Sequence, residues 1–360
     1  MTLPRIAPRS IQIPRGKIRV LIVDDSALIR RLMRQALSED PDIEVAGAES
    51  NGKAALASIP ALEPDLVTLD IEMPEMDGLE TLRRLRAAHS ALRVIMFSSA
   101  TTRGAAATFE ALALGADDYV AKPAQTGSLD ASLGNLRTEL IPRIKQFFRL
   151  ASAPAPRFAP PPARAGARKG TARILAIGVS TGGPQALESV VPLLPANFPV
   201  PVVLVQHMPP MFTRILAERL QAAGSLKVEE AAEGVEVRPG RVLIAPGNYH
   251  LRVRRRGTSV VAALDQGPHE NSCRPSVDVL FRSVAEVYGG EALSVVLTGM
   301  GKDGLRGTEV LKAAGACSLV QDEATSVVWG MPGAIAEAGL ADSVLPLPRI
   351  APEIIRIVTG

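Results

Sequence analysis

Residues 171–190 read TARILAIGVSTGGPQALESV, and this stretch decides the fold of the second half of the chain. The apolar run at 174–177 is typical of a buried strand, a glycine-rich turn follows it, and Pro184 stands where a first helical position is expected. A strand that passes through a tight turn into a helix is the repeating unit of a parallel α/β sheet. The stretch therefore predicts such a sheet, with a strand that ends at Ile177.

The turn of this stretch also satisfies the pattern G-x-S-x-G, through Gly178, Ser180 and Gly182. Between a strand and a helix, that pattern places a serine on an exposed elbow, where it can act as a nucleophile. The N-terminus of the following helix offers free N–H groups and a positive dipole end, which suit a developing oxyanion. A dinucleotide-binding interpretation fails, because Ser180 occupies the second glycine of G-x-G-x-x-G, where a Cβ obstructs a pyrophosphate.

Short apolar runs alternate with helical patterns on both sides of this stretch. The further strand candidates are residues 18–23, 66–69, 94–97 and 119–121 in the front half, and 201–205, 242–244 and 293–297 in the back half. The predicted fold class is α/β, with two doubly wound parallel-sheet domains.

A connector rich in alanine and proline separates the two halves. Residues 151–171 hold seven Ala and five Pro in 21 positions, a composition that cannot bury an apolar face and favours an extended, semi-rigid spacer. We expect a basic and disordered N-terminal extension, a first domain, a linker and a second domain. Their predicted bounds are 1–16, 17–140, 141–171 and 172–360.

Composition and charge exclude several classes of protein. With 360 residues, 47% of them hydrophobic and 21% charged, the chain is not wholly disordered, and its two cysteines fit a reducing compartment. The formal charge of +3 invites a nucleic-acid interpretation, but residues 1–19 carry +5 and residues 141–173 carry +8, which leaves −10 for the rest. No secretory signal and no apolar stretch of about 20 residues is apparent, so we expect a cytoplasmic protein without direct membrane insertion.

Three carboxylates are predicted to gather at one edge of the first sheet. Asp24 and Asp25 follow the first strand, and Asp70 ends a later one. Because parallel strands open at their carboxyl ends into a ligand-binding crevice, these acids repel one another unless a hard cation such as Mg²⁺ neutralises them. Ser98 and Lys122 end two further strands. A hydroxyl, an ammonium and a divalent cation around one carboxylate describe a phosphoryl site, with Asp70 as its nucleophile.

The motifs VDDS, LDIEMPEMDG, FSSA and DYVAKP occur in this order in the front half. On these motifs, residues 17–140 resemble a response-regulator receiver domain, which implies a flavodoxin-like sheet and a histidine kinase as phosphodonor. The residues to which the resemblance gives roles are the phospho-acceptor Asp70, the Mg²⁺ ligands Asp24, Asp25, Asp70 and the Glu72 carbonyl, and the phosphoryl sensors Ser98, Lys122 and Tyr119.

A nucleophilic serine needs a base, and the chain has four histidines: His89, His207, His250 and His269. A lone histidine is more often structural than catalytic. His207 directly follows the strand candidate that ends at residue 205, so its strand end shares a sheet edge with Ser180. His207 is therefore the preferred base.

The acid that orients this base is predicted at Asp303, in a glycine-rich turn after the strand candidate 293–297. An acid there is usually a turn residue, but beside an elbow serine and a strand-end histidine it becomes the leading third member. The order Ser180, His207, Asp303 differs from that of α/β-hydrolases, in which the acid precedes the histidine. Triads are nevertheless defined by geometry and roles.

The motifs GVSTGGPQAL, VQHMP, APGNYHL, RPSVDVLF, LTGMGKDG and VVWGMP together resemble the catalytic domain of chemotaxis protein-glutamate methylesterases. With the receiver in front, the resemblance spans nearly the whole chain and implies a Rossmann-like catalytic domain. It implies Ser180, His207 and Asp303 as the triad, with Thr181 lining the site and the Met300 N–H in the oxyanion hole.

The implied enzyme is a phosphorylation-activated serine hydrolase that serves sensory adaptation. It removes methyl groups from glutamate γ-methyl esters on the cytoplasmic domains of methyl-accepting chemoreceptors and releases methanol, and deamidation of receptor glutamines is an expected second activity. The receiver is expected to use Mg²⁺, and the esterase reaction is expected to need no cofactor. A chemosensory pathway other than chemotaxis stays open.

Two other classes of function stay open from the sequence. A non-catalytic phospho-switch would use the back half only to bind a partner, and the intact Ser180, His207 and Asp303 argue against it. A DNA-binding response regulator is suggested by the receiver and the basic balance. No helix-turn-helix is apparent in the strand-rich, acidic back half, so we expect no nucleic-acid partner.

Overall fold

The computed structural model describes residues 16–99, 101–122, 129–148 and 172–360. The chain forms two compact units, which divide between Ala155 and Pro156. The predicted disordered extension, apart from Gly16, and residues 149–171 of the predicted linker lie outside the described residues. Within the described part of the chain, no helix combines the length and the apolar character needed to cross a bilayer.

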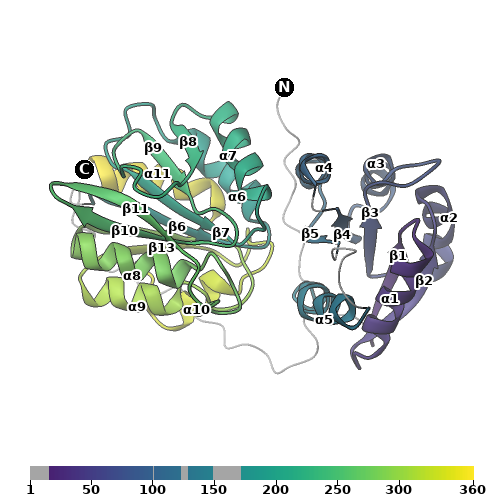
Figure 1. Cartoon of the computed structure of the whole chain (residues 1–360). Helices are drawn as coiled ribbons and strands as arrows, with labels where there is room; N and C mark the ends of the chain where they lie inside the picture. The colour runs from purple at the N-terminus through teal and green to yellow at the C-terminus, as the bar shows by residue number, and fades with distance from the viewer. Residues whose placement is uncertain (1–15, 100, 123–128, 149–171) are drawn as a thin grey trace. The chain divides into compact units, whose positions relative to one another are not determined.

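The first unit is a parallel sheet with the strand order β2-β1-β3-β4-β5, which is the flavodoxin-like order. Helices α1 and α5 contact each other, and α2, α3 and α4 contact one another in succession (Figure 1). The strands are β1 (Ile18–Val23), β2 (Ile43–Glu49), β3 (Leu66–Asp70), β4 (Arg93–Ser98) and β5 (Asp118–Ala121). The helices are α1 (Ala27–Ser38), α2 (Gly52–Leu62), α3 (Gly78–Ala88), α4 (Thr102–Ala113) and α5 (Leu129–Lys145).

Local sequence explains where the first four of these helices begin. Each is preceded by a residue whose side-chain oxygen accepts a hydrogen bond from a backbone N–H of the first turn, which satisfies a donor that the helix itself cannot pair. The capping residues are Ser26, Asn51, Asp77 and Thr101. Strands β1, β3 and β4 are almost entirely buried on both faces, as in other parallel sheets covered by helices, whereas the edge strand β2 is only partly buried.

Helix α5 runs beyond residue 140, where the first domain was predicted to end. Its apolar side chains Leu140 and Ile144 are buried, and so are Phe147 and Phe148 after its end. Residues 141–148 therefore pack with the first unit. Pro142 and the basic charge of this segment favour a connector, but burial of four large apolar side chains outweighs them.

The second unit is built on a seven-stranded parallel sheet with the order β14-β13-β12-β6-β7-β9-β8. From β6 the chain adds strands first on one side and later, from β12 onward, on the other. The gap between the ends of β6 and β12 is thus a topological switch point, where ligands bind in such sheets. The structure confirms the predicted α/β class with two doubly wound parallel sheets.

The strands of this sheet are β6 (Ile174–Val179), β7 (Val202–Gln206), β8 (Lys227–Glu230), β9 (Arg241–Ile244), β12 (Ala292–Val296), β13 (Cys317–Gln321) and β14 (Ser343–Leu345). The helices are α6 (Gly183–Val190), α7 (Phe212–Ala223), α8 (Val277–Tyr288), α9 (Leu305–Ala313), α10 (Met331–Glu337) and α11 (Leu347–Thr359), with short 3₁₀ turns at Val191–Leu193 and Gly289–Glu291.

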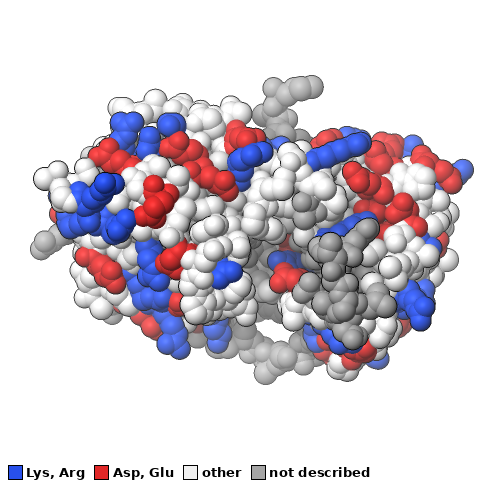
Figure 2. Space-filling view, viewed as in Figure 1, with Lys and Arg blue, Asp and Glu red and all other residues white. Residues whose placement is uncertain are grey.

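An antiparallel hairpin, β10 (His250–Arg256) with β11 (Ser259–Asp265), supplements the parallel sheet and contacts α8. Its tip carries exposed arginines, which form the basic group at the left edge of Figure 2. Arg254 pairs with Glu233 and Arg252 with Asp265, so acidic partners lie among these arginines.

Candidate active site

Ser180 lies directly after β6 and three residues before α6, on the turn that the sequence predicts. Its backbone N–H donates to the carbonyl of Thr298 at 3.0 Å, and its own carbonyl accepts from the Gly183 N–H at 2.8 Å. These two bonds hold the elbow against the turn after β12. The strand runs to Val179 rather than Ile177, and Gly183 rather than Pro184 is the first helical residue.

The glycines of the elbow are required by close packing. Gly182 has a φ of +75°, a left-handed conformation that favours glycine. A Cβ on Gly183 would lie 1.9 Å from Oε1 of Gln206 and 2.1 Å from a methyl of Val179. At Gly183 any larger residue would therefore have to displace the side chain of Gln206 or Val179.

Gln206, the last residue of β7, connects the serine to the histidine. Its Nε2 donates to the carbonyl of Ser180 at 3.0 Å and to that of His207 at 3.2 Å, and its side chain is buried. No role for Gln206 was expected from the sequence. Its position as the only polar residue of β7, at the end of the strand, could have indicated that it has a role at the site.

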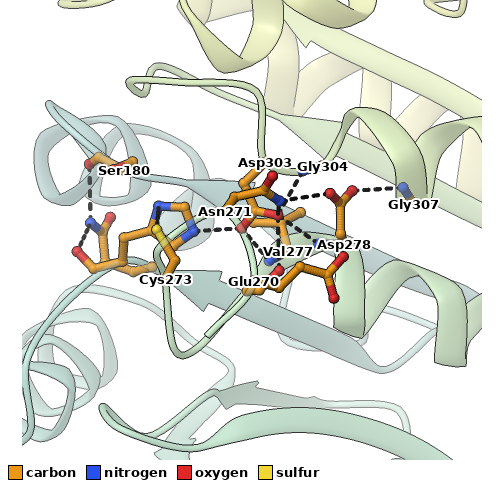
Figure 3. Close-up of polar contacts among 12 residues, drawn as sticks. Ser180, Glu270, Asn271, Cys273, Val277, Asp278, Asp303, Gly304 and Gly307 are labelled. Carbon is orange, nitrogen blue, oxygen red and sulfur yellow. Dashed lines mark hydrogen bonds and ion pairs between the residues drawn. The ribbon is translucent and has the colours of Figure 1, made fainter. Parts of the chain in front are cut away.

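His207 and Asp303 form a direct contact, drawn in Figure 3. Nε2 of His207 lies 2.7 Å from Oδ2 of Asp303, and their side chains are 10% and 2% exposed. His207 follows β7, and Asp303 lies in the turn between β12 and α9. Two turns at the same sheet edge, 96 residues apart in sequence, thus bring the predicted base and acid together.

The carboxylate of Asp303 also closes the N-terminus of α8. It accepts from the backbone N–H groups of Val277 at 2.7 Å and Asp278 at 3.0 Å, and from the hydroxyl of Ser276 at 2.9 Å. Burial favours the neutral acid, but His207 and these N–H groups outweigh burial and hold the pKa of Asp303 below its usual range. Asp303 is therefore an ionised partner for His207.

The second ring nitrogen of His207 faces a sulfur. Sγ of Cys273 lies 3.6 Å from Nδ1. Burial of the ring opposes its charging, but Cys273 and the Asp303 carboxylate outweigh burial and raise the pKa of His207 to about 10. Neither Cys273 nor its contact was expected from the sequence.

The remaining histidines lie elsewhere. His250 is buried, its Nδ1 accepts from the N–H of Ser276 at 3.2 Å, and its Nε2 donates to the carbonyl of Pro268 at 3.0 Å. His269 is exposed, and His89 belongs to the first unit. Among the described residues, only His207 contacts Asp303 through an imidazole. No hydrogen bond joins the Ser180 hydroxyl to His207 in the described structure.

The two predicted lining residues flank the elbow. Thr181 is buried, and its carbonyl accepts from the Thr298 hydroxyl at 2.9 Å. Met300 is partly exposed on the turn after β12, and its backbone N–H has no partner within the described part of the chain.

The first unit brings three acids to the carboxyl ends of its strands. Carboxylate oxygens of Asp24, Asp25 and Asp70 lie within 4.8 Å of one another. Nζ of Lys122 lies 2.7 Å from Asp70 and 3.0 Å from Asp24. This is the acidic cluster with an ammonium that the sequence predicts.

The acidic cluster fits a hard cation. Oδ2 of Asp24 and Oδ2 of Asp70 are both buried, and they share the single positive charge of Lys122, whose Nζ lies 3.0 and 2.7 Å from them. Burial raises the pKa of Asp24, and burial, reinforced by Asp24, raises the pKa of Asp70 to about 6. These acids therefore lack sufficient compensation for their charge, and a divalent ion bound to carboxylates would supply it.

The other predicted residues of this region lie around the acids. Glu72 is exposed and donates its N–H to Asp70 at 3.3 Å. Ser98 is buried, and its hydroxyl donates to the carbonyl of Gly104 at 3.0 Å, toward α4. Tyr119 is buried on β5, and burial raises the pKa of its hydroxyl.

Both units match families of known proteins. Residues 175–354 match the family described as CheB methylesterase, and residues 20–133 match the response regulator receiver domain. A protein-glutamate methylesterase/protein-glutamine glutaminase of Trichodesmium erythraeum is 51% identical over 347 residues, which cover 94% of this chain and 99% of the relative. One of Nocardioides sp. is 51% identical over 348 residues, which cover 94% and 95%. The crystal structure of the Thermotoga maritima CheB methylesterase catalytic domain is 46% identical, with a TM-score of 0.50, and covers 51% of this chain and 97% of that one.

Fold, sites and matches together define a response regulator whose receiver domain precedes an α/β enzymatic output domain. The output domain is thus not the helix-turn-helix domain of a DNA-binding regulator. The chain belongs to the family of protein-glutamate methylesterases/protein-glutamine glutaminases of the CheB type.

Proposed function

We propose that Ser180, His207 and Asp303 hydrolyse glutamate γ-methyl esters on chemoreceptor cytoplasmic domains. The observation that carries this proposal is the 2.7 Å contact between His207 and an ionised, buried Asp303, at the sheet edge that also holds the Ser180 elbow. The names of the relatives supply the substrate class. The same geometry accepts a glutamine side chain, so deamidation is the second activity.

The chemistry follows from which atoms are already engaged. Nε2 of His207 is committed to Asp303, so Nδ1 is the nitrogen that accepts the proton of the Ser180 hydroxyl as its Oγ attacks the ester carbonyl. Nδ1 then protonates the methoxide as it leaves, and methanol departs. Water attacks the acyl-enzyme by the same route and releases free glutamate and the serine. For a glutamine the leaving group is ammonia.

The oxyanion of the tetrahedral intermediate needs N–H donors that are not used within the fold. The Ser180 and Gly183 N–H groups are committed to carbonyls. The Met300 N–H has no such partner in the described structure, which supports it as an oxyanion donor, and the Thr181 side of the turn lines the same site.

The receiver is proposed to control this reaction through phosphorylation of Asp70 by a chemotaxis histidine kinase. Asp24, Asp25, Asp70 and the carbonyl of Glu72 would hold Mg²⁺, which neutralises charge during phosphoryl transfer. Lys122, already 2.7 Å from Asp70, would pair with a phosphoryl oxygen, and Ser98 and Tyr119 would sense the modified state. The proposed location is the cytoplasm, where kinase and receptor domains meet.

Methanol release from a methylated chemoreceptor fragment tests these assignments, with and without acetyl phosphate. Ser180→Ala should lower kcat by about 10⁴- to 10⁶-fold. Ser189→Ala, which alters an exposed serine of α6, is the matched control and should leave kcat unchanged. Asp70→Asn should abolish stimulation by acetyl phosphate but keep basal release. Equal release by Ser180→Ala and the unaltered protein would refute the serine assignment.

A further inference from the structure

Asn271 lies on the loop between β11 and α8, and its amide contacts two buried carboxylates. Nδ2 lies 2.9 Å from Oδ1 of Asp303 and 2.9 Å from Oδ2 of Asp278, and Figure 3 shows the amide between the two acids. An amide nitrogen carries two hydrogens, so each acid receives its own hydrogen bond. A flipped amide would set its oxygen against both carboxylates, so the contacts themselves fix its orientation.

The two acids need such a bridge because they are buried side by side. Asp303 is 1% exposed and Asp278 is 0% exposed, and Asp278 also accepts the N–H of Gly307 at 2.6 Å. Burial and the charge of Asp303 raise the pKa of Asp278 to about 6, although the Gly307 N–H acts in the opposite direction. A proton taken up by this pair would weaken the charge with which Asp303 orients His207.

The loop keeps its position without the Asn271 side chain. Glu270 and Cys273 exchange two backbone hydrogen bonds, at 3.1 and 2.8 Å, and Glu270 forms a two-pronged ion pair with Arg282 at 2.6 and 2.7 Å. Asn271 and Ser272 have φ values of 52° and 63°, which glycine also adopts without strain. Removing the amide should therefore leave the loop in place.

We propose that Asn271 is a positioning residue of the esterase, bridging Asp278 and Asp303 so that Asp303 stays ionised and directed at His207. The inference rests on the proposed function of Ser180, His207 and Asp303. Asn271 acts through Asp303, since its amide hydrogens are used by the two acids.

Other charged or titratable groups face this cluster from each element packed against it. They are Glu270 and Cys273 of the loop, Asp278 and Arg282 of α8, and His250 of β10. All of them stay unchanged when Asn271 is replaced. An aspartate at position 271 has the shape of asparagine but adds a negative charge, which raises the pKa of His207 and of both acids.

Three variants of the full chain test the proposal: Asn271→Asp, Asn271→Gly and the matched control Ser272→Gly. Methanol release from a methylated chemoreceptor fragment gives kcat and KM against pH, and NMR follows the titration of the His207 ring. Asn271→Asp should move the acid limb of kcat/KM and the His207 titration up by about one pH unit, because a hydrogen bond to an ionised group is worth about that much. Asn271→Gly should lower kcat roughly tenfold with little change in KM. Ser272→Gly should change neither.

An unchanged pH limb and His207 titration in Asn271→Asp, together with an unchanged kcat in Asn271→Gly, would overturn the proposal, and so would equal effects in Ser272→Gly. If Asn271→Asp does not fold, the glycine variant, whose φ of 52° suits glycine, decides through kcat and KM: an unchanged kcat then overturns the proposal. Failure of the proposed function has a different signature, namely methanol release that Ser180→Ala leaves intact. The NMR titration still judges Asn271 in that case.

Discussion

Nε2 of His207 lies 2.7 Å from Oδ2 of Asp303, while the same carboxylate accepts the N–H groups at the start of α8. Asp303 thus orients the base and caps a helix at once. His207 and the N–H groups at the positive end of the helix dipole together keep the acid ionised. In the proposed mechanism, fold stability and catalysis therefore both depend on the Asp303 side chain.

Asp303→Asn should damage both properties. An amide nitrogen in place of Oδ2 donates to Nε2 of His207, which moves the ring proton to Nδ1 and leaves no acceptor for the serine proton. The same amide nitrogen is a donor, so the Val277 N–H loses the acceptor that Oδ2 of Asp303 provides. We expect kcat to fall by about 10⁴-fold and the free energy of unfolding to fall by about 1–3 kcal/mol.

Methanol release and urea denaturation, followed by the fluorescence of the single tryptophan, Trp329, measure the two effects. Asp342→Asn is the matched control, because Asp342 pairs with Lys312 and Ser318 away from the histidine. It should lower stability alone. A kcat of Asp303→Asn within tenfold of the unaltered enzyme would contradict the orienting role.

The contact between Cys273 and His207 predicts a pH dependence. Because Asp303 and Cys273 raise the pKa of His207 above 6.5 and only the neutral ring accepts a proton, the acid limb of kcat/KM should lie above pH 6.5. Cys273→Ala removes one cause of the raised pKa. Its acid limb should therefore lie at lower pH, by about one unit.

Profiles of methanol release from pH 6 to 11, a range that covers the raised pKa of His207, measure this shift. Cys317→Ala is the matched control, since it removes the other cysteine, which lies on β13. It should leave the limb in place. A limb that moves up, or not at all, in Cys273→Ala would show that the sulfur does not influence the base.

The sequence predicted the elements whose residues are mostly apolar. The runs that became β1, β6 and β7 were visible as buried strands, and the polar residues just after them marked the sheet edge. The hairpin of β10 and β11 was missed as a pair. Four of the seven residues of β10 are arginines, and the last three are consecutive and exposed, so the strand has no continuous apolar run.

Only those site residues that directly follow a strand could be predicted from the sequence. Ser180, His207 and Asp303 all follow apolar runs, so topology alone brings them to one edge. Asn271 and Cys273 come from a polar loop 30 or more residues before Asp303, and no local pattern tells which way such a loop folds. The contacts of Asn271 with Asp303 and of Cys273 with His207 are therefore found only from the structure.

Gly299 packs directly against Ser180, so a side chain added there should disturb the position of the serine. A Cβ on Gly299 would lie 2.9 Å from Cβ of Ser180 and 2.5 Å from the sulfur of Met331. Gly299→Ala should therefore push the serine away from the base and lower kcat by about 10²-fold. Stopped assays of methanol release measure kcat, and circular dichroism checks the fold.

Gly339→Ala is the control for the glycine effect itself. Gly339 has a φ of +70° and open space around the added Cβ, so the change should cost about 1 kcal/mol of stability and leave kcat unaltered. Full activity of Gly299→Ala would mean that the elbow yields to the added methyl group, contrary to the tight packing described above.

The acids of the receiver predict that Mg²⁺ binding weakens in mild acid. Burial raises the pKa of Asp70 to about 6, so between pH 6 and pH 4 the folded domain holds a proton that the unfolded chain lacks. The ionised form is thus the disfavoured one in the folded, metal-free state, and stability falls as the pH rises through 6. A bound Mg²⁺ would compensate the carboxylate charge at pH 8, but at pH 5 it must displace the proton from Asp70.

We expect the Kd for Mg²⁺, measured by titration calorimetry, to rise at least tenfold from pH 8 to pH 5, and Asp70→Asn to lose most of this dependence. Equal affinity at both pH values would mean that Asp70 is ionised throughout and that Lys122 alone compensates its charge.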